Sequence, residues 1–151
     1  MICLLAKHPQ YIEPLREEAE KVVSKNGWSE DAVAKMRKID SFIKEALRFE
    51  SSRTSMHFLH CIISLTLFPV GPIRKAREDV TLSNGLFIPR GTTISFAAHA
   101  IEHDERTYKN PNVFEPFRFV DLQDRSNDPS KYHLTSVSND CLAFGIGKRA
   151  W

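Results

Sequence analysis

The stretch that decides the expected fold is Phe144-Gly145-Ile146-Gly147-Lys148-Arg149-Ala150-Trp151. Its two glycines allow a tight turn in which the backbone can approach another surface, because no Cβ stands in the way. A basic side chain beside such a turn can meet a carboxylate. Taken alone, the segment fits an ordinary glycine turn as well as a binding loop, so the choice depends on the rest of the chain.

Two further motifs precede this loop. Glu45-Ala46-Leu47-Arg48 lies in a segment of helical periodicity, where residues three apart are neighbours and can form an ion pair. By itself E-x-x-R is a common pattern, and an exposed pair contributes only about 0.2–1 kcal/mol. The segment Phe114-Glu115-Pro116-Phe117-Arg118-Phe119 comes next. Taken alone, Arg118 in this segment is also consistent with an ordinary surface arginine in an aromatic loop.

Together the three motifs resemble the cytochrome P-450 family of haem-thiolate monooxygenases. That family has E-x-x-R, F-x-P-x-R-F and F-G-x-G-x-R-x-C in this order, and the chain keeps the order. The intervening run 98–111 is similar in particular to the fungal microsomal members. The loop departs from the family pattern at its last position, where Trp151 replaces the cysteine.

The resemblance implies a role for each motif residue. A buried structural triad would be formed by Glu45, Arg48 and Arg118, and the haem-binding residues would be Arg74, Phe144, Gly145, Gly147 and Arg149, the two arginines as propionate partners. The family cysteine ligates the iron as a thiolate, whereas the indole nitrogen of Trp151 is a donor only. Cys141 lies on the wrong side of the loop to substitute. No catalytic residue and no metal ligand are therefore expected in this chain.

The resemblance also implies a fold and an activity. The expected fold is mainly α with a small antiparallel β part (α+β), an incomplete cytochrome P-450 fold in one partial domain over residues 1–151. The family uses haem and an NADPH-dependent reductase to insert one oxygen atom from O₂ into a small apolar substrate. Haem binding by this chain is in doubt, and a non-catalytic fragment or mis-spliced product is the alternative. Full-length relatives are anchored in the endoplasmic reticulum membrane, so the location of this chain stays open.

Composition agrees with one globular domain. The chain has 151 residues, of which 42% are hydrophobic and 26% charged. A net charge of +2 gives no argument for nucleic acid or anionic membranes as partners. Three cysteines do not make a secreted disulfide framework, and the apolar start is too short for a signal peptide.

Periodicity and turn residues predict the local elements. Helices are expected over residues 9–23 and 35–49, with Pro14 in a first turn and Ser29 as the N-cap of a short helix between them. The second long helix is expected to bury the stripe Met36, Ile39, Ile43 and Leu47.

The later part is expected to be rich in β-structure. A hairpin is predicted around Ser83-Asn84-Gly85, then a turn at 89–91, a strand over 92–97 and a long polar surface loop over 121–139. His99 and His103 suggest a metal site, but ordinary hydrogen-bonded or exposed histidines are favoured because no ligand cluster accompanies them.

Residues 52–69 do not fit the family pattern. They divide the chain into helices over 1–51, a probable insert, a β-rich region over 70–119, and a loop over 120–151 that ends in the truncated haem-binding loop. A membrane segment is disfavoured by its shortness and by His57 and His60, so no transmembrane segment is expected. Two interpretations of the segment remain: a strand or helix added to the fold, or an intron translated in frame. The intron is preferred because joining Ser51 to Val70 restores a short connection.

The intron hypothesis makes a prediction about the gene. A cysteine codon begins with TG, and an intron that opens there with GTAA would be read as tryptophan followed by a stop. We therefore expect the genomic DNA to show a splice donor directly after the TG of codon 151, and a cysteine once that intron is removed. Sequencing the locus and its transcripts checks this, and the absence of a donor there contradicts it.

Overall fold

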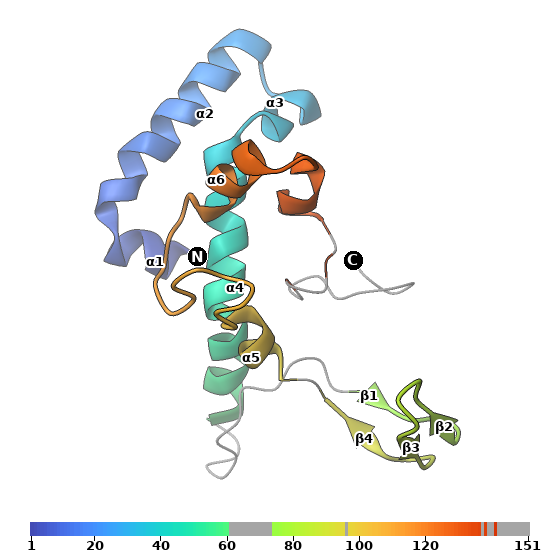
Figure 1. Ribbon diagram of the computed structural model, residues 1–151. Helices are drawn as coiled ribbons and strands as arrows, with labels where there is room; N and C mark the ends of the chain where they lie inside the picture. Colours follow the sequence, from blue (N-terminus) through green and yellow to red (C-terminus); the bar gives the residue numbers. More distant parts are fainter. Residues whose placement is uncertain (61–73, 96, 137, 139–140, 142–151) are drawn as a thin grey trace.

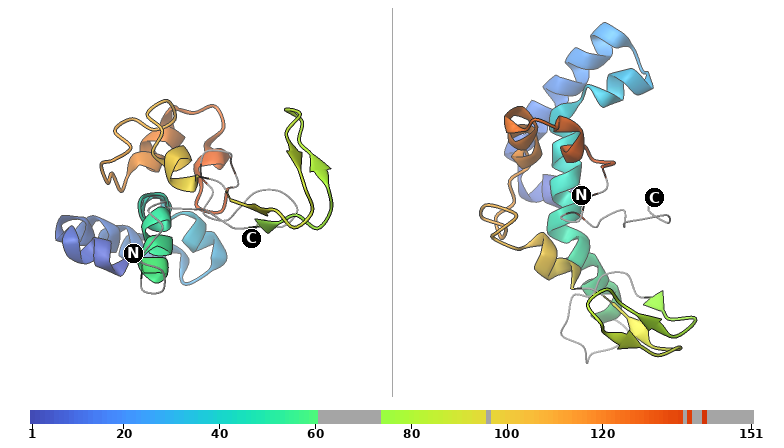
Figure 2. Two further views of the ribbon diagram at one scale, coloured as in Figure 1. Left: turned by 90° about the horizontal axis from the view of Figure 1, so that it is seen from below. Right: turned by 45° about the vertical axis from the view of Figure 1, so that its right-hand side comes forward.

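A long central helix organises the computed structural model, with the other helices packed around it (Figure 1). The structure describes residues 1–60, 74–95, 97–136, 138 and 141, and for residues 51–60 it describes the backbone alone. Helix α4 (Arg37–His60) runs through the middle of the molecule. Figure 2 shows the N-terminal helices and the segment that carries α6 on different sides of it.

The N-terminal third forms a series of helices. They are α1 (Ile2–Lys7), the 3₁₀ turn η1 (Pro9–Tyr11), α2 (Ile12–Asn26) and α3 (Glu30–Ala34). Pro14 lies in the first turn of α2, as predicted, where its missing N–H costs nothing. Helix α2 ends at Gly27, which has φ 67°, and Ser29 caps α3 by accepting a hydrogen bond from Ala32 N at 3.2 Å.

The prediction that α4 ends at Phe49 is wrong. The helix continues to His60, because neither proline nor glycine occurs between Phe49 and that residue. Its buried face also differs from the predicted apolar stripe. Of the four stripe residues only Met36 is buried, whereas the polar residues Ser41, Lys44, Glu45 and Arg48 are all at most 2% exposed.

Four short strands form two antiparallel pairs that lie beyond α5, apart from the helices (Figures 1 and 2). The hairpin is confirmed: β2 (Val80–Thr81) pairs with β3 (Phe87–Ile88), and Gly85 turns the chain with φ 84°. The predicted strand over 92–97 is shorter, β4 (Thr93–Ile94), and pairs with β1 (Arg74–Lys75).

The predicted surface loop over 121–139 is only partly a loop. Helix α6 (Arg118–Arg125) and the 3₁₀ turn η2 (Pro129–Tyr132) occupy much of it. Polar residues dominate this segment, but Phe119 and Gln123, one turn apart, are buried, and α6 packs against α4. The short helix α5 (Ala98–Glu102) also packs against α4.

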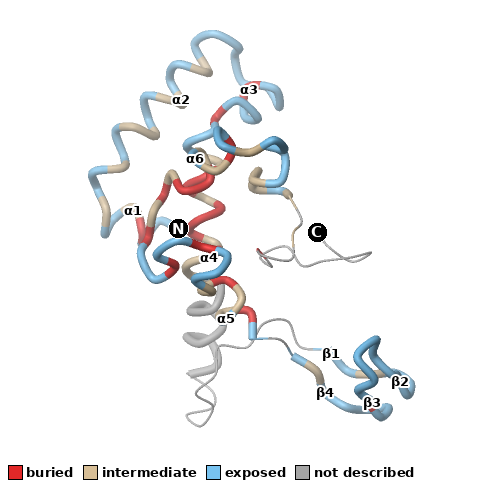
Figure 3. The backbone as a smooth tube through the Cα atoms, in the orientation of Figure 1, coloured by how far each residue is buried: buried red, intermediate tan, exposed pale blue. Residues whose placement is uncertain are grey.

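Burial is concentrated along α4 and the segments that contact it (Figure 3). The apolar core joins α1, α4 and the loop before α6, through Leu4, Phe42, Ala46 and Phe114. The Phe114 ring meets Phe42 edge-on, with centroids 5.6 Å apart. Among the described residues, no helix is long and apolar enough to cross a membrane.

Candidate functional site

Glu45 and Arg48 form a buried, two-point ion pair on one face of α4. Arg48 Nε donates to Glu45 Oε2 and Arg48 Nη2 donates to Glu45 Oε1, both at 2.8 Å. Both side chains are 0% exposed. This parallel geometry is the strongest arrangement open to a guanidinium and a carboxylate.

Arg118 is the third member of the buried group, as the resemblance implies. It is the first residue of α6, and its Nε donates to Glu45 Oε1 at 3.2 Å. Its other nitrogens donate to the backbone carbonyls of Lys109, Asn110 and Val113, so one side chain holds the loop before α6 at several points. Asn110, with φ 49°, has the left-handed backbone conformation that this tight loop requires.

The group carries two positive charges for one buried negative charge, and carbonyl oxygens compensate the excess. Arg48 Nη1 donates to Glu102 O at 2.6 Å, at the end of α5, and its guanidinium lies 5.0 Å from the Tyr108 ring centroid. Arg118 has a second carboxylate, Glu115, at 3.4 Å, but that side chain is 43% exposed. The buried arrangement is stable only because each guanidinium is both paired and hydrogen-bonded.

Ser41, one turn before Glu45 on α4, fixes the same loop. Its hydroxyl donates to Pro116 O at 2.8 Å and accepts from Phe119 N at 3.1 Å. Glu45 Oε1 also accepts from Glu115 N at 3.1 Å. Ser41 belongs to none of the three motifs, although its helical spacing of four from Glu45 places both residues on one face of α4.

A second polar pair on α4, Asp40 and Lys44, holds the turn that follows η2. Both Asp40 carboxylate oxygens accept from Leu134 N, at 3.1 and 3.0 Å. Lys44 Nζ donates to Lys131 O, His133 O and Ser136 Oγ, at 3.2, 2.7 and 2.7 Å. The pair thus hydrogen-bonds one backbone amide and two backbone carbonyls of this segment. The segment precedes the predicted haem-binding loop in the sequence.

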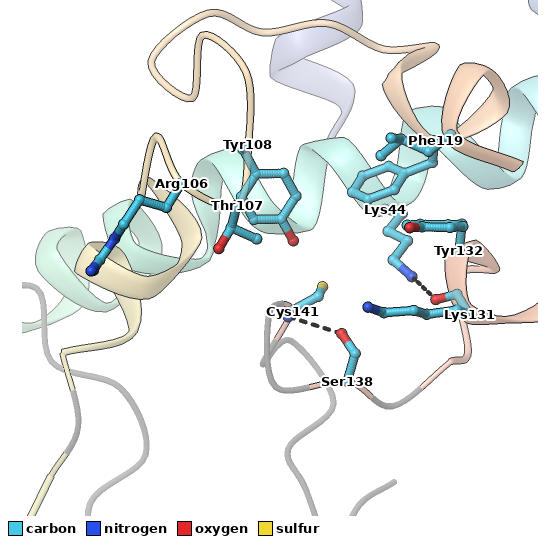
Figure 4. Close-up of a pocket in the computed structure, with 10 residues that line it drawn as sticks. Lys44, Arg106, Thr107, Tyr108, Phe119, Lys131, Tyr132, Ser138 and Cys141 are labelled. Carbon is cyan, nitrogen blue, oxygen red and sulfur yellow. Dashed lines mark hydrogen bonds between the residues drawn. The ribbon is translucent and has the colours of Figure 1, made fainter. Parts of the chain in front are cut away.

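A cavity of about 290 Å³ lies beside the Lys44 ammonium (Figure 4). Its lining residues are Lys44, Arg106, Thr107, Tyr108, Phe119, Leu122, Lys131, Tyr132, Ser138 and Cys141. Burial lowers the pKa of Lys44, and the nearby Cys141 and Asp40 oppose that shift. Cys141 is 6% exposed, and its backbone N–H donates to Ser138 Oγ at 3.2 Å.

The remaining predicted site residues are not brought together in the described structure. Arg74 lies exposed on β1, and its propionate role stays a prediction. Phe144, Gly145, Gly147, Arg149 and Trp151 lie outside the described residues. Within the described part of the chain, no group of three or more His, Cys, Asp or Glu side chains is placed to hold a metal ion.

Comparison with known proteins identifies the family of this chain. The family model for cytochrome P450 matches residues 1–150. Cytochrome P450 monooxygenases 71 and 110 of Postia placenta are each 38% identical over 146 residues, which cover 97% of this chain and 26% of the relative. Fumitremorgin C monooxygenase of Neosartorya fischeri is 37% identical over 153 residues, covering 99% of this chain and 27% of the relative.

This chain therefore belongs to the cytochrome P450 family. It spans about a quarter of the length of the curated relatives that it matches. The expected fold class, mainly α with a small antiparallel β part, is confirmed by the elements of the structure.

The triad predicts a large effect of removing one charge. Glu45→Gln keeps the shape of the side chain but leaves two buried guanidiniums without their carboxylate, so we expect a loss of about 3–5 kcal/mol in the free energy of unfolding. Urea unfolding followed by circular dichroism measures this loss. Glu115→Gln is the matched control, since that exposed carboxylate contacts the same Arg118, and it should change stability by less than about 1 kcal/mol. Equal losses in the two variants would contradict the assignment.

Lys44 gives a prediction with a defined pH dependence. Lys44→Met removes three donated hydrogen bonds and should destabilise the fold by about 1–3 kcal/mol at neutral pH, whereas Lys38→Met, at an exposed position of α4, should cost under about 1 kcal/mol.

Because burial lowers the pKa of Lys44, the folded state binds its proton less tightly than the unfolded state. The wild-type chain should thus gain stability relative to Lys44→Met as pH rises from the lowered folded pKa toward the ordinary value. Urea unfolding across this range checks the sign, and a falling difference would contradict it.

Proposed function

We propose that the gene encodes a haem-dependent monooxygenase, and that this chain carries the structural triad of that enzyme without its iron ligand. The single observation that supports the first part is the buried group itself. Glu45, Arg48 and Arg118 are at most 7% exposed and joined by charge-assisted hydrogen bonds, in a chain that belongs to the cytochrome P450 family. In this proposal the enzyme uses O₂, reductase-supplied electrons and a small apolar substrate.

The donor set of this chain does not fit a haem-thiolate centre. The family ligand is a cysteine thiolate, and residue 151 is tryptophan, whose nitrogen cannot donate a lone pair to iron. Cys141 is buried beside Lys44 in the cavity described above, and its position three residues before Phe144 makes it a poor replacement. We therefore propose that this chain has no monooxygenase activity of its own.

The second candidate is a non-catalytic product of the same gene, and Trp151 is the observation that favours it. Translation of unspliced sequence would account for Trp151 and for residues 52–69 together. Residues 52–60 continue α4 as helix, so this interpretation does not require an interruption of the helix that bears Glu45 and Arg48.

Absorbance spectroscopy tests the proposed loss of activity. The chain is mixed with haem, reduced and treated with carbon monoxide, and we expect no haem-thiolate Soret band, because no thiolate stands at the ligand position. A haem-thiolate band in the unmodified chain would contradict the proposal. Cys141→Ser then shows whether that band came from Cys141.

A matched pair of chimaeras tests the family function. Residues 1–151 replace the aligned segment of a Postia placenta relative, once with Trp151 and once with Trp151→Cys. We expect the haem-thiolate band and monooxygenase turnover only with cysteine at this position. A thiolate band in the tryptophan chimaera would contradict the proposal that residue 151 stands at the position of the iron ligand. A cysteine chimaera that binds haem without a thiolate band would contradict the proposal that residues 144–151 form the haem-binding loop.

A further inference from the structure

The chain contains two Asn-Gly pairs, and they lie in different structural settings. Asn84-Gly85 belongs to the turn between β2 and β3, whereas Asn26-Gly27 ends α2. In an Asn-Gly pair the backbone nitrogen of glycine can attack the side-chain carbonyl carbon of asparagine and release ammonia, and the missing Cβ of glycine leaves that approach open. The same reaction is therefore possible at both pairs, and the local structure decides which of them reaches the required conformation.

The turn at Asn84 joins two very short strands. β2 and β3 contain two residues each and form a sheet of their own, and a two-stranded hairpin is marginally stable at best. The hairpin lies apart from the helices, beyond α5, and both Asn84 and Gly85 are exposed (Figures 1 and 2). Local opening of this turn should therefore cost little free energy.

One hydrogen bond favours the reaction at Asn84 and one opposes it. Asn84 Oδ1 accepts from Leu86 N at 3.0 Å, and this donor polarises the carbonyl that is attacked. Gly85 N, the nucleophile, donates to Leu82 O at 2.9 Å and must leave that carbonyl before it reacts. Because a single backbone hydrogen bond at an exposed turn is lost, the opening that the reaction needs is local.

Asn26 is also exposed but is held by a long helix. Its Nδ2 donates to Val22 O and its Oδ1 accepts from Lys35 Nζ, both at 3.0 Å. Gly27 N donates to Val23 O at 2.8 Å, which continues the hydrogen-bond pattern of the 15-residue helix α2. Lys35 polarises the side-chain carbonyl, as the donor at the other pair does. The two pairs therefore differ in backbone freedom, since attack here requires the end of α2 to unwind.

We propose that Asn84 is a site of spontaneous deamidation and that it reacts before Asn26. Gly85 N gives its proton to water or hydroxide and forms a bond to Asn84 Cγ. The Cγ–Nδ2 bond breaks, and the departing nitrogen takes up a proton and leaves as ammonia. A second water molecule then opens the succinimide ring at either carbonyl, which leaves aspartate or isoaspartate at position 84.

The isoaspartate product should disturb the hairpin. Isoaspartate lengthens the backbone at the turn by one carbon atom, and the length of the turn fixes the register of a hairpin. The register that pairs Val80 with Ile88 and Thr81 with Phe87 should then be lost. This inference does not depend on the proposed monooxygenase function, because it uses only residues of the hairpin and of α2.

Peptide mapping by mass spectrometry tests the proposal on the full chain, incubated under native conditions at mildly alkaline pH. We expect the peptide with Asn84 to deamidate at least about tenfold faster than the peptide with Asn26, which corresponds to a barrier lower by about 1.4 kcal/mol. Equal rates, or faster reaction at Asn26, would overturn the proposal. Isoaspartate should accumulate at position 84, and aspartate alone would contradict the succinimide step.

The same incubation in urea separates structure from local sequence. In the unfolded chain neither a hairpin nor a helix restrains the pairs, so the ratio of the two rates should fall toward one. A ratio as large in urea as in the folded chain would show that the neighbouring residues set the difference, and the structural argument would fail. Asn84→Gln should abolish deamidation at position 84 under native conditions and leave the rate at Asn26 unchanged.

Discussion

The buried carboxylate of Glu45 is the constraint on which the rest of the structure depends. Two guanidiniums and one backbone amide share its oxygens in a part of the molecule from which water is excluded. A charge at such a position is tolerated only when it is paired and hydrogen-bonded. The three partners belong to α4 itself, to the loop before α6 and to the start of α6, so this single group fixes where those segments lie.

Helix α4 acts on its neighbours mainly through side chains that bind backbone. Ser41 and Glu45 hold the loop before α6, Asp40 and Lys44 hold the turn after η2, and Arg48 holds the end of α5. Each of these bonds satisfies a carbonyl or amide in a segment without extensive secondary structure of its own. These hydrogen bonds hold loops and turns against the helix in addition to their apolar contacts.

The sequence predicted the elements that depend on local chemistry. Ser29 as an N-cap, Pro14 in a first turn and the hairpin at Gly85 were confirmed because each follows from one or two residues. Apolar periodicity alone predicted the wrong buried face for α4, since it says nothing about polar residues whose partners lie far along the chain. Helix α6 was missed for the same reason, because Phe119 and Gln123 are buried where α6 packs against α4 and η2, which lie elsewhere in the chain. The triad was predicted from the resemblance to the family, and no local pattern around Arg118 would have placed it beside Glu45.

Both arginines of the triad are buried and hydrogen-bonded in the folded chain. Measurement of hydrogen exchange at the arginine Nε–H groups by nuclear magnetic resonance tests this claim without any substitution. Arg48 and Arg118 each donate through Nε to Glu45, whereas Arg16 is exposed. We expect the Nε–H signals of Arg48 and Arg118 to persist in D₂O long after that of Arg16 has exchanged. Exchange of all three at the same rate would contradict the account.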